Sequence, residues 1–583
     1  IALGPDFRLV SIDAAFGTVN WELVLPPLPG AIPKRGILAA DGKVFLNVGP
    51  RLFALDSETG KATRSFASGS VYSGPSRVPP FLYGRGVYVL SIDGFLRGFD
   101  IETGELLAEI SYRSDSHPGY ASIPWSGVAL DAENGLAFFG TGNPKPDLVG
   151  ISRPGSNEGA NTLLAIDLDD ERVAWSFQEV QHDLWDYDIA SPPVLANIQV
   201  SDTEELRLVI IATKTGNVLI FDRQSGANLH DIEWVSVDTS TSIPNEYVSP
   251  VQINSALPER LIRIEYLEDD YSEGDPDEVR GIRDFLASAN LGFYPPHQIG
   301  KTTVAYGIHG GAEWPGSTVN YDKGFLFTPV NHTPWKLRVD PTTRVKYESL
   351  SEEFRVDWSD EYQEYIANCG GCHTEKRSGV NIRSREKEVA YTPSLIGFSL
   401  WRGDTAAFKS AVGESHGDKD FDSVDLSRMY SFFSSWDEEL DRINAIEFSG
   451  GWSYFLTNKG NFATDLAYGK VVATNILTGK IEWQSFPGET ALYNSVRKGK
   501  SMFGGLAASD DGLLYVTGSD DNNLYVLDQD DGAILESHAL PAAGSAPPTL
   551  LSIDGRTSVA ILATGGKFYN YTTKGASLSL YQH

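Results

Sequence analysis

A short repeated unit constrains the fold of this chain more than any other feature of its sequence. In each copy, an alternating apolar strand leads into an acidic tight turn with glycine, and a second strand follows that often ends in Trp or Phe. Seven clear copies begin at Leu9, Leu52, Leu96, Leu163, Val218, Val471 and Leu524. Because strand side chains alternate between two faces and Asp/Gly turns are typical of hairpins, each copy predicts two strands of a small antiparallel sheet.

The number and spacing of the copies favour a β-propeller, in which small sheets are arranged radially so that few sheet edges are exposed. A diverged copy begins at Gly324 and brings the number to eight. The sequence therefore predicts an all-β fold, an eight-bladed β-propeller, with blades 1–6 in residues 1–340 and blades 7–8 in residues 442–583. A β-solenoid or a β-sandwich is the alternative architecture. We expect the chain to begin after processing or truncation, because Leu9–Trp21 already forms the end of a β unit.

The repeat stops in one segment, from about Pro341 to Asp441. Three stretches in it have the apolar spacing of helices, namely Ser359–Asn368, Asp404–Val412 and Val424–Trp436. We therefore expect a small α-helical domain, residues 341–441, to be inserted between two blades.

Both cysteines of the chain lie in this segment, in the motif Cys369-Gly370-Gly371-Cys372-His373. The spacing CxxCH is that of covalent haem c attachment, in which two thiols add across the vinyl groups and the adjacent His binds the iron. A redox CxxC pair or half of a zinc site is the alternative, but the chain has no second Cys pair. The sequence thus predicts an inserted cytochrome c domain with haem on Cys369 and Cys372 and with His373 as proximal ligand.

The second axial ligand of this haem has two candidates in the sequence. His416 lies on the stretch Gly413–Asp422, which we expect to be a loop before the last helix, and Met429 lies within that helix. The distal ligand of small cytochromes c normally comes from such a loop, so His416 is favoured. Ligation by Met429 or by water stays the alternative, and two His ligands would give the iron a lower potential than His and Met.

Several motifs in the propeller part occur together at characteristic spacing. They are His182–Asp188, Ala212–Asn217, Phe221–Arg223, Thr141–Pro144, Gly310–Gly316 and Gly504-Gly505. The set resembles the pyrroloquinoline quinone (PQQ) dehydrogenases of the glucose and methanol types, and the matches extend over nearly the whole propeller. A cytochrome c unit between late blades is a known variation of that architecture, so the two cofactors support each other.

The resemblance implies roles for individual residues. Asp186 matches the catalytic base that takes the proton of the substrate hydroxyl, and Lys214 matches the residue that polarises the quinone carbonyl receiving the hydride. Trp125 matches the indole on which the flat cofactor stacks. These residue types suit the chemistry, because a carboxylate can accept a proton and a planar quinone packs on an aromatic ring. Each also has a structural alternative, as a core Trp, a turn Asp or a hairpin Lys.

A cation site is implied in the same way. Asn143 and Asp186 match metal ligands, and Asp93, four residues before Arg97, occupies a place where the alcohol-oxidising members carry Glu. Ca²⁺ is the expected ion, since hard cations prefer oxygen ligands. Asp188 adds a further carboxylate, as in members that use a lanthanide and also in glucose types that do not. Asn143 in a Gly-Asn-Pro sequence is also a good turn residue.

The sequence departs from the family pattern in three respects. The vicinal Cys-Cys pair of alcohol-type members is absent, the loop before Arg97 is short, and no His near Arg35–Ile37 matches the glucose type. The substrate class therefore stays open between an alcohol and an aldose.

The composition limits the partners. The net charge of −31 disfavours nucleic acid and anionic lipid, and no apolar run reaches the length of about 20 residues that spans a membrane. We expect a periplasmic quinohaemoprotein dehydrogenase that passes electrons through haem c to an external acceptor, such as a soluble cytochrome or a membrane quinone. The alternatives are a non-catalytic propeller scaffold that carries an electron-transfer haem and a propeller enzyme with another cofactor, such as a haem-type nitrite reductase.

Overall fold

A computed structural model gives the structure of the chain, and the described residues are 1–3, 8–25, 36–63, 66, 70–71, 74–114, 122–377, 394–416, 424–492, 495–553, 555–565, 573, 575 and 577–582. The side chains of Cys372 and His416 lie outside this description. The fold is mostly β, with few helices.

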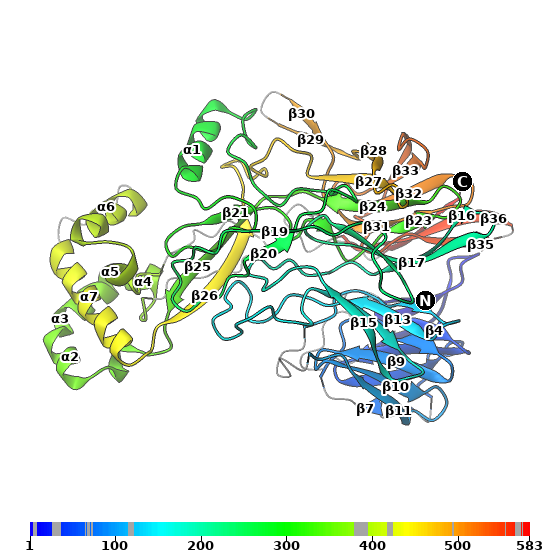
Figure 1. Ribbon diagram of the computed structural model, residues 1–583, viewed down its shortest axis with the longest axis horizontal. Coiled ribbons are helices and arrows are strands. Elements are labelled where there is room, and N and C mark those ends of the chain that lie inside the picture. The colour runs from blue at the N-terminus through cyan, green and yellow to red at the C-terminus, as the bar shows by residue number, and fades with distance from the viewer. Residues whose placement is uncertain are drawn as a thin grey trace.

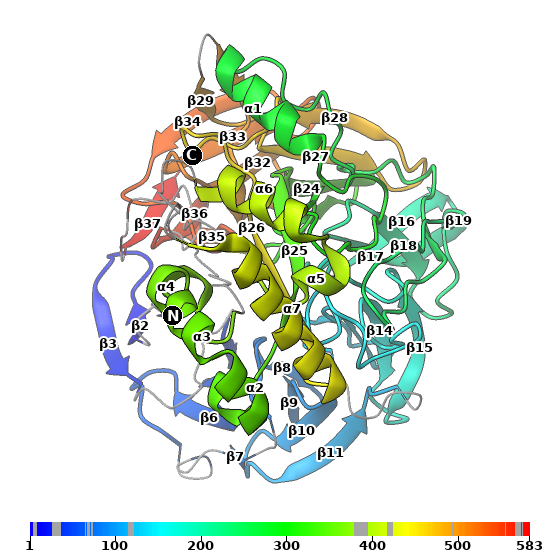
Figure 2. The same cartoon turned by 90° about the vertical axis from the view of Figure 1, so that its left-hand side faces the viewer.

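Small antiparallel sheets surround a common centre (Figure 2). The first four sheets are β1 (Ala2–Leu3), β2 (Arg8–Ile12) and β3 (Val19–Val24); β4 (Leu38–Ala40), β5 (Lys43–Val48), β6 (Arg51–Asp56) and β7 (Ser70–Val71); β8 (Phe81–Tyr83), β9 (Gly86–Ser91), β10 (Phe95–Asp100) and β11 (Leu106–Ser111); and β12 (Ala129–Asp131), β13 (Leu136–Gly140), β14 (Thr162–Asp167) and β15 (Arg172–Gln178). Next come β16 (Val194–Ser201), β17 (Glu204–Ala212) and β18 (Val218–Asp222), and the pair β19 (Trp234–Ser236) and β20 (Val251–Ile253).

The later sheets mix strands that are far apart in sequence. One contains β22 (Gly311–Ala312), β23 (Thr318–Asn320), β24 (Phe325–Asn331), β27 (Gly469–Asn475) and β28 (Ile481–Ser485), and another contains β21 (Thr303–Ala305), β25 (Trp335–Thr342) and β26 (Glu447–Tyr454). The last are the pair β29 (Glu489–Ala491) and β30 (Val496–Lys498), the sheet of β31 (Met502–Ala508), β32 (Leu513–Ser519), β33 (Asn523–Asp528) and β34 (Ile534–Ala539), and the sheet of β35 (Thr549–Ile553), β36 (Arg556–Ala563) and β37 (Ser577–Gln582).

The repeated units are hairpins, as their sequence predicts. In the unit at Leu9, β2 pairs with β3, and the same antiparallel pairing joins β10 to β11, β14 to β15, β27 to β28 and β33 to β34. The acidic residue of the turn closes it: Asp56 Oδ1 accepts the backbone N–H of Thr59 at 2.8 Å, and Asp222 Oδ1 accepts that of Ser225 at 2.8 Å. The turn glycine then takes a positive φ, +69° at Gly60, which other residues rarely adopt.

The Trp and the Gly of the repeat join neighbouring sheets. The indole of Trp175, on β15, lies against Gly226 in the turn after β18, and its Nε1 donates to the carbonyl of Arg223 at 3.1 Å. Trp21 packs in the same way on Gly60, and Trp483 on Gly532. Buried apolar side chains fill the space between sheets, for example between β8–β11 and β12–β15. The core is therefore built between sheets rather than within one centre.

The prediction that the unit at Gly324 forms a hairpin is wrong. Its first strand, β24, pairs with β27 from Phe325↔Asn475 to Asn331↔Gly469, and its second strand, β25, pairs with β21 and β26. The copies at Gly324 and Val471 thus share one sheet and are not separate blades. The physical reason is the connection, because His332-Thr333-Pro334 contains no acidic glycine turn that would fold the chain back on itself.

The helices form a separate group at one side of the sheets (Figure 1). They are 3₁₀-helix η2 (Tyr347–Ser349) and α-helices α2 (Glu352–Asp357), α3 (Ser359–Asn368), α4 (Gly370–His373), α5 (Phe398–Trp401), α6 (Thr405–His416) and α7 (Leu426–Arg442). A ribbon of β25 and β26, paired from Trp335↔Tyr454 to Thr342↔Glu447, leads to them. A further helix, α1 (Pro276–Leu286), lies apart in the acidic excursion before β21.

The three predicted helices are confirmed, one of them to the residue, but their predicted ends are not all right. Helix α6 continues to His416, so Gly413–His416 is helical and not part of a loop. The residues that follow Val412 are compatible with a helix, and the single glycine Gly413 lowers helix stability without ending helix α6. Helix α7 buries one face, formed by Met429, Phe432, Phe433, Trp436 and Leu440. This spacing of three and four residues is that of an amphipathic helix.

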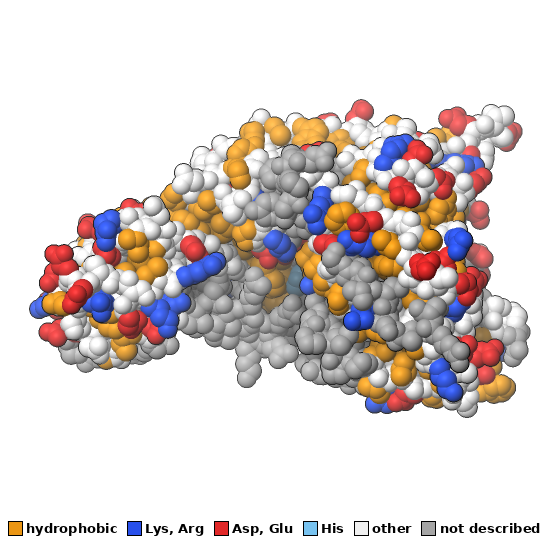
Figure 3. Space-filling model, turned by 90° about the horizontal axis from the view of Figure 1, so that it is seen from below, with side chains coloured by type: hydrophobic (Ala, Val, Ile, Leu, Met, Phe, Trp, Pro, Cys, Tyr) orange, Lys and Arg blue, Asp and Glu red, His pale blue; other side chains and the backbone are white. Residues whose placement is uncertain are grey.

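Within the described residues, no helix is long and apolar enough to cross a membrane. Among the described residues on the face drawn in Figure 3, Lys and Arg side chains are interspersed with Asp and Glu and form no extended basic patch.

Candidate active site

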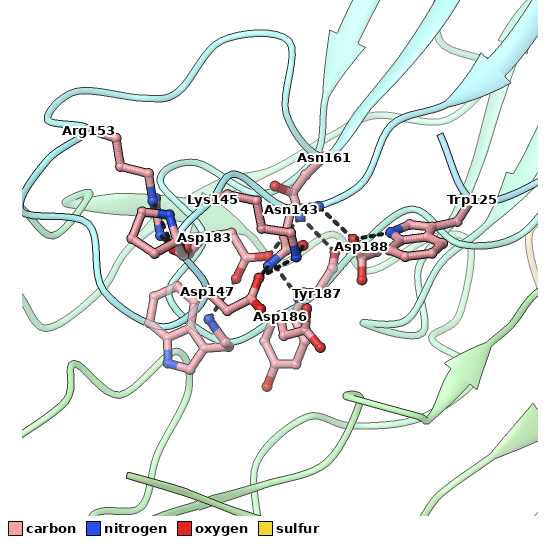
Figure 4. Close-up of polar contacts among 12 residues, drawn as sticks. Trp125, Asn143, Lys145, Asp147, Arg153, Asn161, Asp183, Asp186, Tyr187 and Asp188 are labelled. Carbon is pink, nitrogen blue, oxygen red and sulfur yellow. Dashed lines mark hydrogen bonds and ion pairs between the residues drawn. The ribbon is translucent and has the colours of Figure 1, made fainter. Parts of the chain in front are cut away.

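Loops from two neighbouring sheets bring together the predicted residues Trp125, Asn143, Asp186 and Lys214, and Figure 4 shows the first three with Asp188. Trp125 precedes β12, Asn143 follows β13, Asp186 and Asp188 lie between β15 and β16, and Lys214 lies in the turn between β17 and β18. Asn143, Asp186, Asp188 and Lys214 are buried, and Trp125 is half-buried. The buried position of Lys214 excludes the solvated hairpin lysine that the sequence left open.

The loop that carries the two aspartates is fixed by Asp183. Its carboxylate accepts the backbone N–H groups of Trp185 and Tyr187, both at 2.7 Å. Trp185 and Tyr187 point into the core, where the indole Nε1 donates to the carbonyl of Pro295 at 2.9 Å and the tyrosine hydroxyl donates to that of Tyr306 at 3.0 Å. Alternate residues therefore face inward, and Asp186, with a φ of +65°, and Asp188 face the site.

Lys214 and Asp188 form the centre of the cluster. Lys214 Nζ lies 2.6 Å from Asp188 Oδ2, donates to the backbone carbonyl of Asp186 at 3.0 Å, and is 3.8 Å from Asp186 Oδ2. The turn that carries Lys214 is itself anchored, because the hydroxyl of Thr213 and the amide of Asn217 donate to buried Glu179 at 2.7 and 2.9 Å.

The other carboxylate oxygen of Asp188 connects the remaining residues. It accepts the indole Nε1 of Trp125 at 3.0 Å and the backbone N–H of Asn143 at 2.6 Å. A Cβ atom at Gly142 would lie 2.4 Å from this oxygen and 2.8 Å from the indole nitrogen, so only glycine fits there. The Thr-Gly-Asn-Pro motif thus serves close packing around Asp188, whose central position the sequence did not reveal.

The two aspartates have opposite electrostatic surroundings. Burial raises the pKa of Asp186 well above its usual range, because Lys214 offsets the loss of hydration only in part and Asp188 adds repulsion. Burial acts on Asp188 too, but Lys214, Lys145 and the hydrogen bonds it accepts hold its pKa below the usual range. Both aspartates in turn raise the pKa of Lys214 despite its burial, so its ammonium stays protonated.

Two charged residues of the site were not predicted. Lys145 Nζ donates to Asn143 Oδ1 at 3.0 Å and contacts Asp147, which also accepts the side-chain N–H of Asn143 at 2.7 Å. Their signal in the sequence is the presence of two charged residues within three positions after the Gly-Asn-Pro turn. The amide oxygen of Asn143 and the carboxylate of Asp147 therefore both contact the ammonium group of Lys145. Amide and carboxylate oxygens are also the ligands that a hard metal ion prefers.

The cation site is nevertheless incomplete in the described part of the chain. No group of three or more His, Cys, Asp or Glu side chains there is arranged to hold a metal ion. Asp93 instead pairs with Arg97, with oxygen–nitrogen distances of 3.0 and 3.1 Å, and its backbone carbonyl accepts Arg113 Nε. The structure does not place Asp93 in the cluster of Asp186 and Asn143, and its role as a ligand stays a prediction.

The CxxCH motif occupies the turn from α3 into α4. Cys369 caps α3 and is half-buried, His373 is buried, and the His373 N–H donates to the Cys369 carbonyl at 2.9 Å, which sets the two residues one helical turn apart. The side chain of Cys372 lies outside the described residues, as does that of His416. Met429 is buried in α7.

Unsatisfied polar atoms near this motif fit a bound haem. Thr374 Oγ1, Arg377 Nε and Trp436 Nε1 are buried without a hydrogen-bond partner in the described structure. Such atoms are rare in native proteins unless a ligand or water satisfies them. Arg377 also pairs with Asp437 at 2.6 Å.

Comparisons with known proteins agree with the motifs. The family described as "PQQ: Glucose/ethanol/alcohol dehydrogenase, beta-propeller domain" matches residues 85–376 and 429–559, which together make up more than half of the chain. A "Quinoprotein glucose dehydrogenase" from Escherichia coli (strain K12) is 28% identical over 316 residues, or 43% of this chain and 38% of that protein. The "Quinohemoprotein alcohol dehydrogenase ADH IIB" from Pseudomonas putida is 25% identical over 291 residues, or 41% of each chain.

A solved structure shows the same fold. The quinohemoprotein alcohol dehydrogenase from Comamonas testosteroni superimposes with a TM-score of 0.57 over 99% of this chain and 71% of that chain, at 16% identity. The sequence matches to the two curated relatives span only about two fifths of their length.

Proposed function

Because this chain belongs to the glucose/ethanol/alcohol dehydrogenase family of PQQ β-propellers, we propose that it is a quinohaemoprotein dehydrogenase. It oxidises a hydroxyl group of an alcohol or an aldose and passes the electrons through haem c to an external acceptor, such as a soluble cytochrome or a membrane quinone. The observation that carries the proposal is the buried cluster of Asp186, Asp188 and Lys214 beside Trp125 and Asn143. Strongly shifted pKa values with defined charge partners are typical of functional sites.

Asp186 is the general base in this proposal. Its carboxylate is buried but directly paired only at 3.8 Å with Lys214, so it keeps an oxygen for the proton of the substrate hydroxyl. Burial raises its pKa, and a carboxylate with a raised pKa is a stronger proton acceptor.

Lys214 is the electrophilic partner. Its ammonium stays charged because Asp186 and Asp188 raise its pKa, and Asp188 together with the backbone carbonyl of Asp186 orients it. A fixed positive charge in a buried site stabilises negative charge that develops on a nearby oxygen. Bound PQQ supplies a planar quinone that accepts a hydride, and Trp125 offers the aromatic surface for it.

Asn143 and Asp186 would hold the cation, with Asp188 beside them and Asp93 as a further candidate. Ca²⁺ suits the amide and carboxylate oxygens, and a lanthanide would gain from the additional carboxylate of Asp188. The cation would polarise oxygens in the site.

The helical part carries the second redox group in this proposal. Cys369 and Cys372 would attach haem c and His373 would bind its iron, which supplies one-electron chemistry. We propose His416 as the distal ligand, with Met429 as its competitor. His416→Ala is then expected to open the ferrous iron to carbon monoxide, whereas an effect of Met429→Leu alone would assign the ligand to Met429.

The architecture that we propose for this function has eight blades and an inserted cytochrome c domain. Eight of the sheets support the number: those of β1–β3, β4–β7, β8–β11, β12–β15 and β16–β18, the sheet of β22, β23, β24, β27 and β28, and those of β31–β34 and β35–β37. Residues 341–441 form the cytochrome c domain, and residues 1–340 and 442–583 form the propeller. The covalent haem and the external acceptor are the reasons to propose a periplasmic location.

The experiment is reconstitution. Purified protein is incubated with PQQ and Ca²⁺, and the absorbance of bound quinone and of reduced haem is followed while a panel of alcohols and aldoses is added. The proposal expects quinone binding and haem reduction by one substrate class. Failure to bind PQQ, with the haem still reducible by dithionite, would instead support a non-catalytic scaffold.

A further inference from the structure

Lys145 places a positive charge at the oxygen that the family resemblance assigns to a metal ion. Its Nζ atom donates to Asn143 Oδ1 at 3.0 Å and contacts Asp147 Oδ1, and Figure 4 shows the Lys145 side chain directed toward these two residues. Asp147 also accepts the side-chain N–H of Asn143 at 2.7 Å. The three side chains thus form a closed set of hydrogen bonds, which fixes the ammonium group at this place.

The two aspartates of the site act on the same ammonium group. Loss of hydration alone would lower the pKa of Lys145, but Asp188, Asp186 and Asp147 together raise the pKa above its usual value. The ammonium group is therefore charged at neutral pH. Lys145 in turn favours the ionised forms of Asp186 and Asp188. It thus already has the electrostatic effect that a bound cation would have on these carboxylates.

The arrangement suits an ammonium group better than a divalent metal ion. Ca²⁺ takes about six to eight oxygen ligands, whereas no group of three or more His, Cys, Asp or Glu side chains surrounds such a position within the described residues. Asp93, a candidate for a further ligand, is paired with Arg97 at 3.0 Å. A lysine ammonium has only three N–H donors, and Asn143 and Asp147 accept two of them. The third is available for an oxygen of a bound cofactor.

A metal ion at the same oxygens would meet the ammonium group of Lys145. Two positive charges a few ångströms apart repel each other, and burial reduces the screening of this repulsion by water and salt. Pro144 and Pro146 flank the lysine and restrict its backbone. A metal ion could therefore bind only if the side chain swung away, and this would break its contacts with Asn143 and Asp147.

We propose that the ammonium group of Lys145 takes the place of the divalent metal ion in this chain, so that PQQ binds without Ca²⁺. The inference rests on the proposed function and departs from it in one part, because a side chain then supplies the positive charge beside Asn143 and Asp186. PQQ is a tricarboxylate, and a buried site that already contains several carboxylates needs positive charge to hold it. Lys145 is a binding residue for the cofactor, and Asp186 and Lys214 keep their roles.

The test compares PQQ binding with and without metal. Full-length protein is freed of PQQ and metal by dialysis against EDTA and titrated with PQQ, once in EDTA and once in excess Ca²⁺, and binding is followed by quenching of tryptophan fluorescence. Wild type, Lys145→Met and the control Lys480→Met are compared. Methionine keeps the length of the apolar stem and removes the charge. Lys480 is an exposed lysine in the turn between β27 and β28, so its replacement changes the net charge equally.

We expect wild type to bind PQQ equally well in EDTA and in Ca²⁺. Lys145→Met should bind PQQ at least about tenfold more weakly in EDTA, the loss expected for a hydrogen bond from a charged group. Excess Ca²⁺ should restore its binding, because the metal ion can then occupy the oxygens that Lys145 has left. Lys480→Met should behave like wild type in both solutions.

A wild type that binds PQQ only in Ca²⁺ would overturn the inference and leave the proposed function intact. Undiminished binding to Lys145→Met in EDTA would overturn it as well, and so would a loss that Ca²⁺ does not restore, since Lys145 would then act only through the local structure. If Lys145→Met does not fold, the two titrations of wild type still decide. If wild type binds PQQ in neither solution, the proposed function itself has failed.

Discussion

Asp186 and Asp188 are two residues apart, and we propose different tasks for them because their neighbours differ. Asp188 accepts hydrogen bonds on both oxygens, from Trp125 and Asn143 on one and from Lys214 on the other. Asp186 is buried with its nearest cation at 3.8 Å. Asp188 is therefore suited to hold the site together, and Asp186 is suited to accept a proton.

Asp186→Asn tests this division. The amide has nearly the same shape and keeps one oxygen for a cation, so the variant should fold and bind quinone. Turnover should fall about 10²- to 10⁴-fold, because an amide cannot accept the hydroxyl proton. Dithionite should still reduce the haem fully. Substrate-driven haem reduction at the wild-type rate in the variant would refute the role of Asp186 as base.

The position of Lys145 leads to a prediction about the affinity of the site for a metal ion. Its ammonium is 3.0 Å from Asn143 Oδ1, the oxygen that the family resemblance assigns to the cation. Two positive charges repel each other at this range, so Lys145 should weaken metal binding. Lys145→Thr is expected to raise the affinity for Ca²⁺ about tenfold or more, measured by calorimetric titration of metal-free protein. An unchanged affinity in the variant would show that Lys145 moves away from the site when the metal binds.

The sequence indicated Asn143, Asp186 and Lys214 because each lies in a motif of the family resemblance, and it indicated Trp125 because this residue matches a position of the family on the segment before Asn143. The sequence could not indicate that Asp188 joins Trp125, Asn143 and Lys214. These contacts depend on how the loops fold around its carboxylate.

At the scale of elements, the contact between the Trp of one repeat and the turn Gly of the next explains why neighbouring sheets pack together. Gly226 has a φ of +70°, and a Cβ atom there would lie 2.7 Å from the indole of Trp175. Gly17, in the turn of the first unit, has a φ of +68° with nothing within 4 Å. The two glycines thus share the backbone constraint but only Gly226 has the packing constraint.

Gly17→Ala and Gly226→Ala separate these constraints. Both should lose about 1–3 kcal/mol of stability from the positive φ, and Gly226→Ala should lose more because Trp175 must move. The midpoints of thermal unfolding, measured side by side, report the difference. If the two variants lose the same stability, the contact between Trp175 and Gly226 does not hold the sheets together.

His332, in the connection between β24 and β25, predicts how stability depends on pH. It is buried against Tyr306, Nε2 lies 3.1 Å from the Arg263 carbonyl, and burial lowers its pKa from 6.5 to about 3. Between these values the unfolded chain binds a proton that the folded chain does not, so stability falls as the pH drops from about 6.5 towards 3.

The matched variant is His332→Gln, which can still donate to the Arg263 carbonyl but cannot be protonated. Its urea midpoint should fall less steeply than that of wild type between pH 7 and pH 4.5. Parallel curves for the two proteins would mean that His332 does not contribute to the acid sensitivity.

The hairpins were predictable because a strand, an acidic turn and a second strand are local in sequence. The pairing of β24 with β27 was not, because the two strands are separated by the whole helical segment. A repeat indicates which segments become strands, but it does not state which distant strand completes a sheet.

At the scale of the whole molecule, the helical part is attached through the ribbon of β25 and β26, in front of the ring of sheets (Figure 2). The same ribbon begins at Trp335 and Tyr454, whose rings contact each other with centres 4.0 Å apart and planes tilted by 38°, and His309 lies beside Trp335. His309 is on the loop that packs on the Lys214 turn, where Gly307 and Gly311 leave room only for backbone. A continuous series of contacts thus leads from the candidate quinone site to the helical part that carries the candidate haem site.

The measurement that tests this account most directly is the absorption spectrum of the haem under anaerobic conditions when substrate is added. Oxidised protein loaded with PQQ and Ca²⁺ should show reduced haem after addition of an alcohol or an aldose, and the same protein without PQQ should not, although dithionite reduces both. A PQQ-loaded protein whose haem stays oxidised with every substrate of the panel would contradict the account.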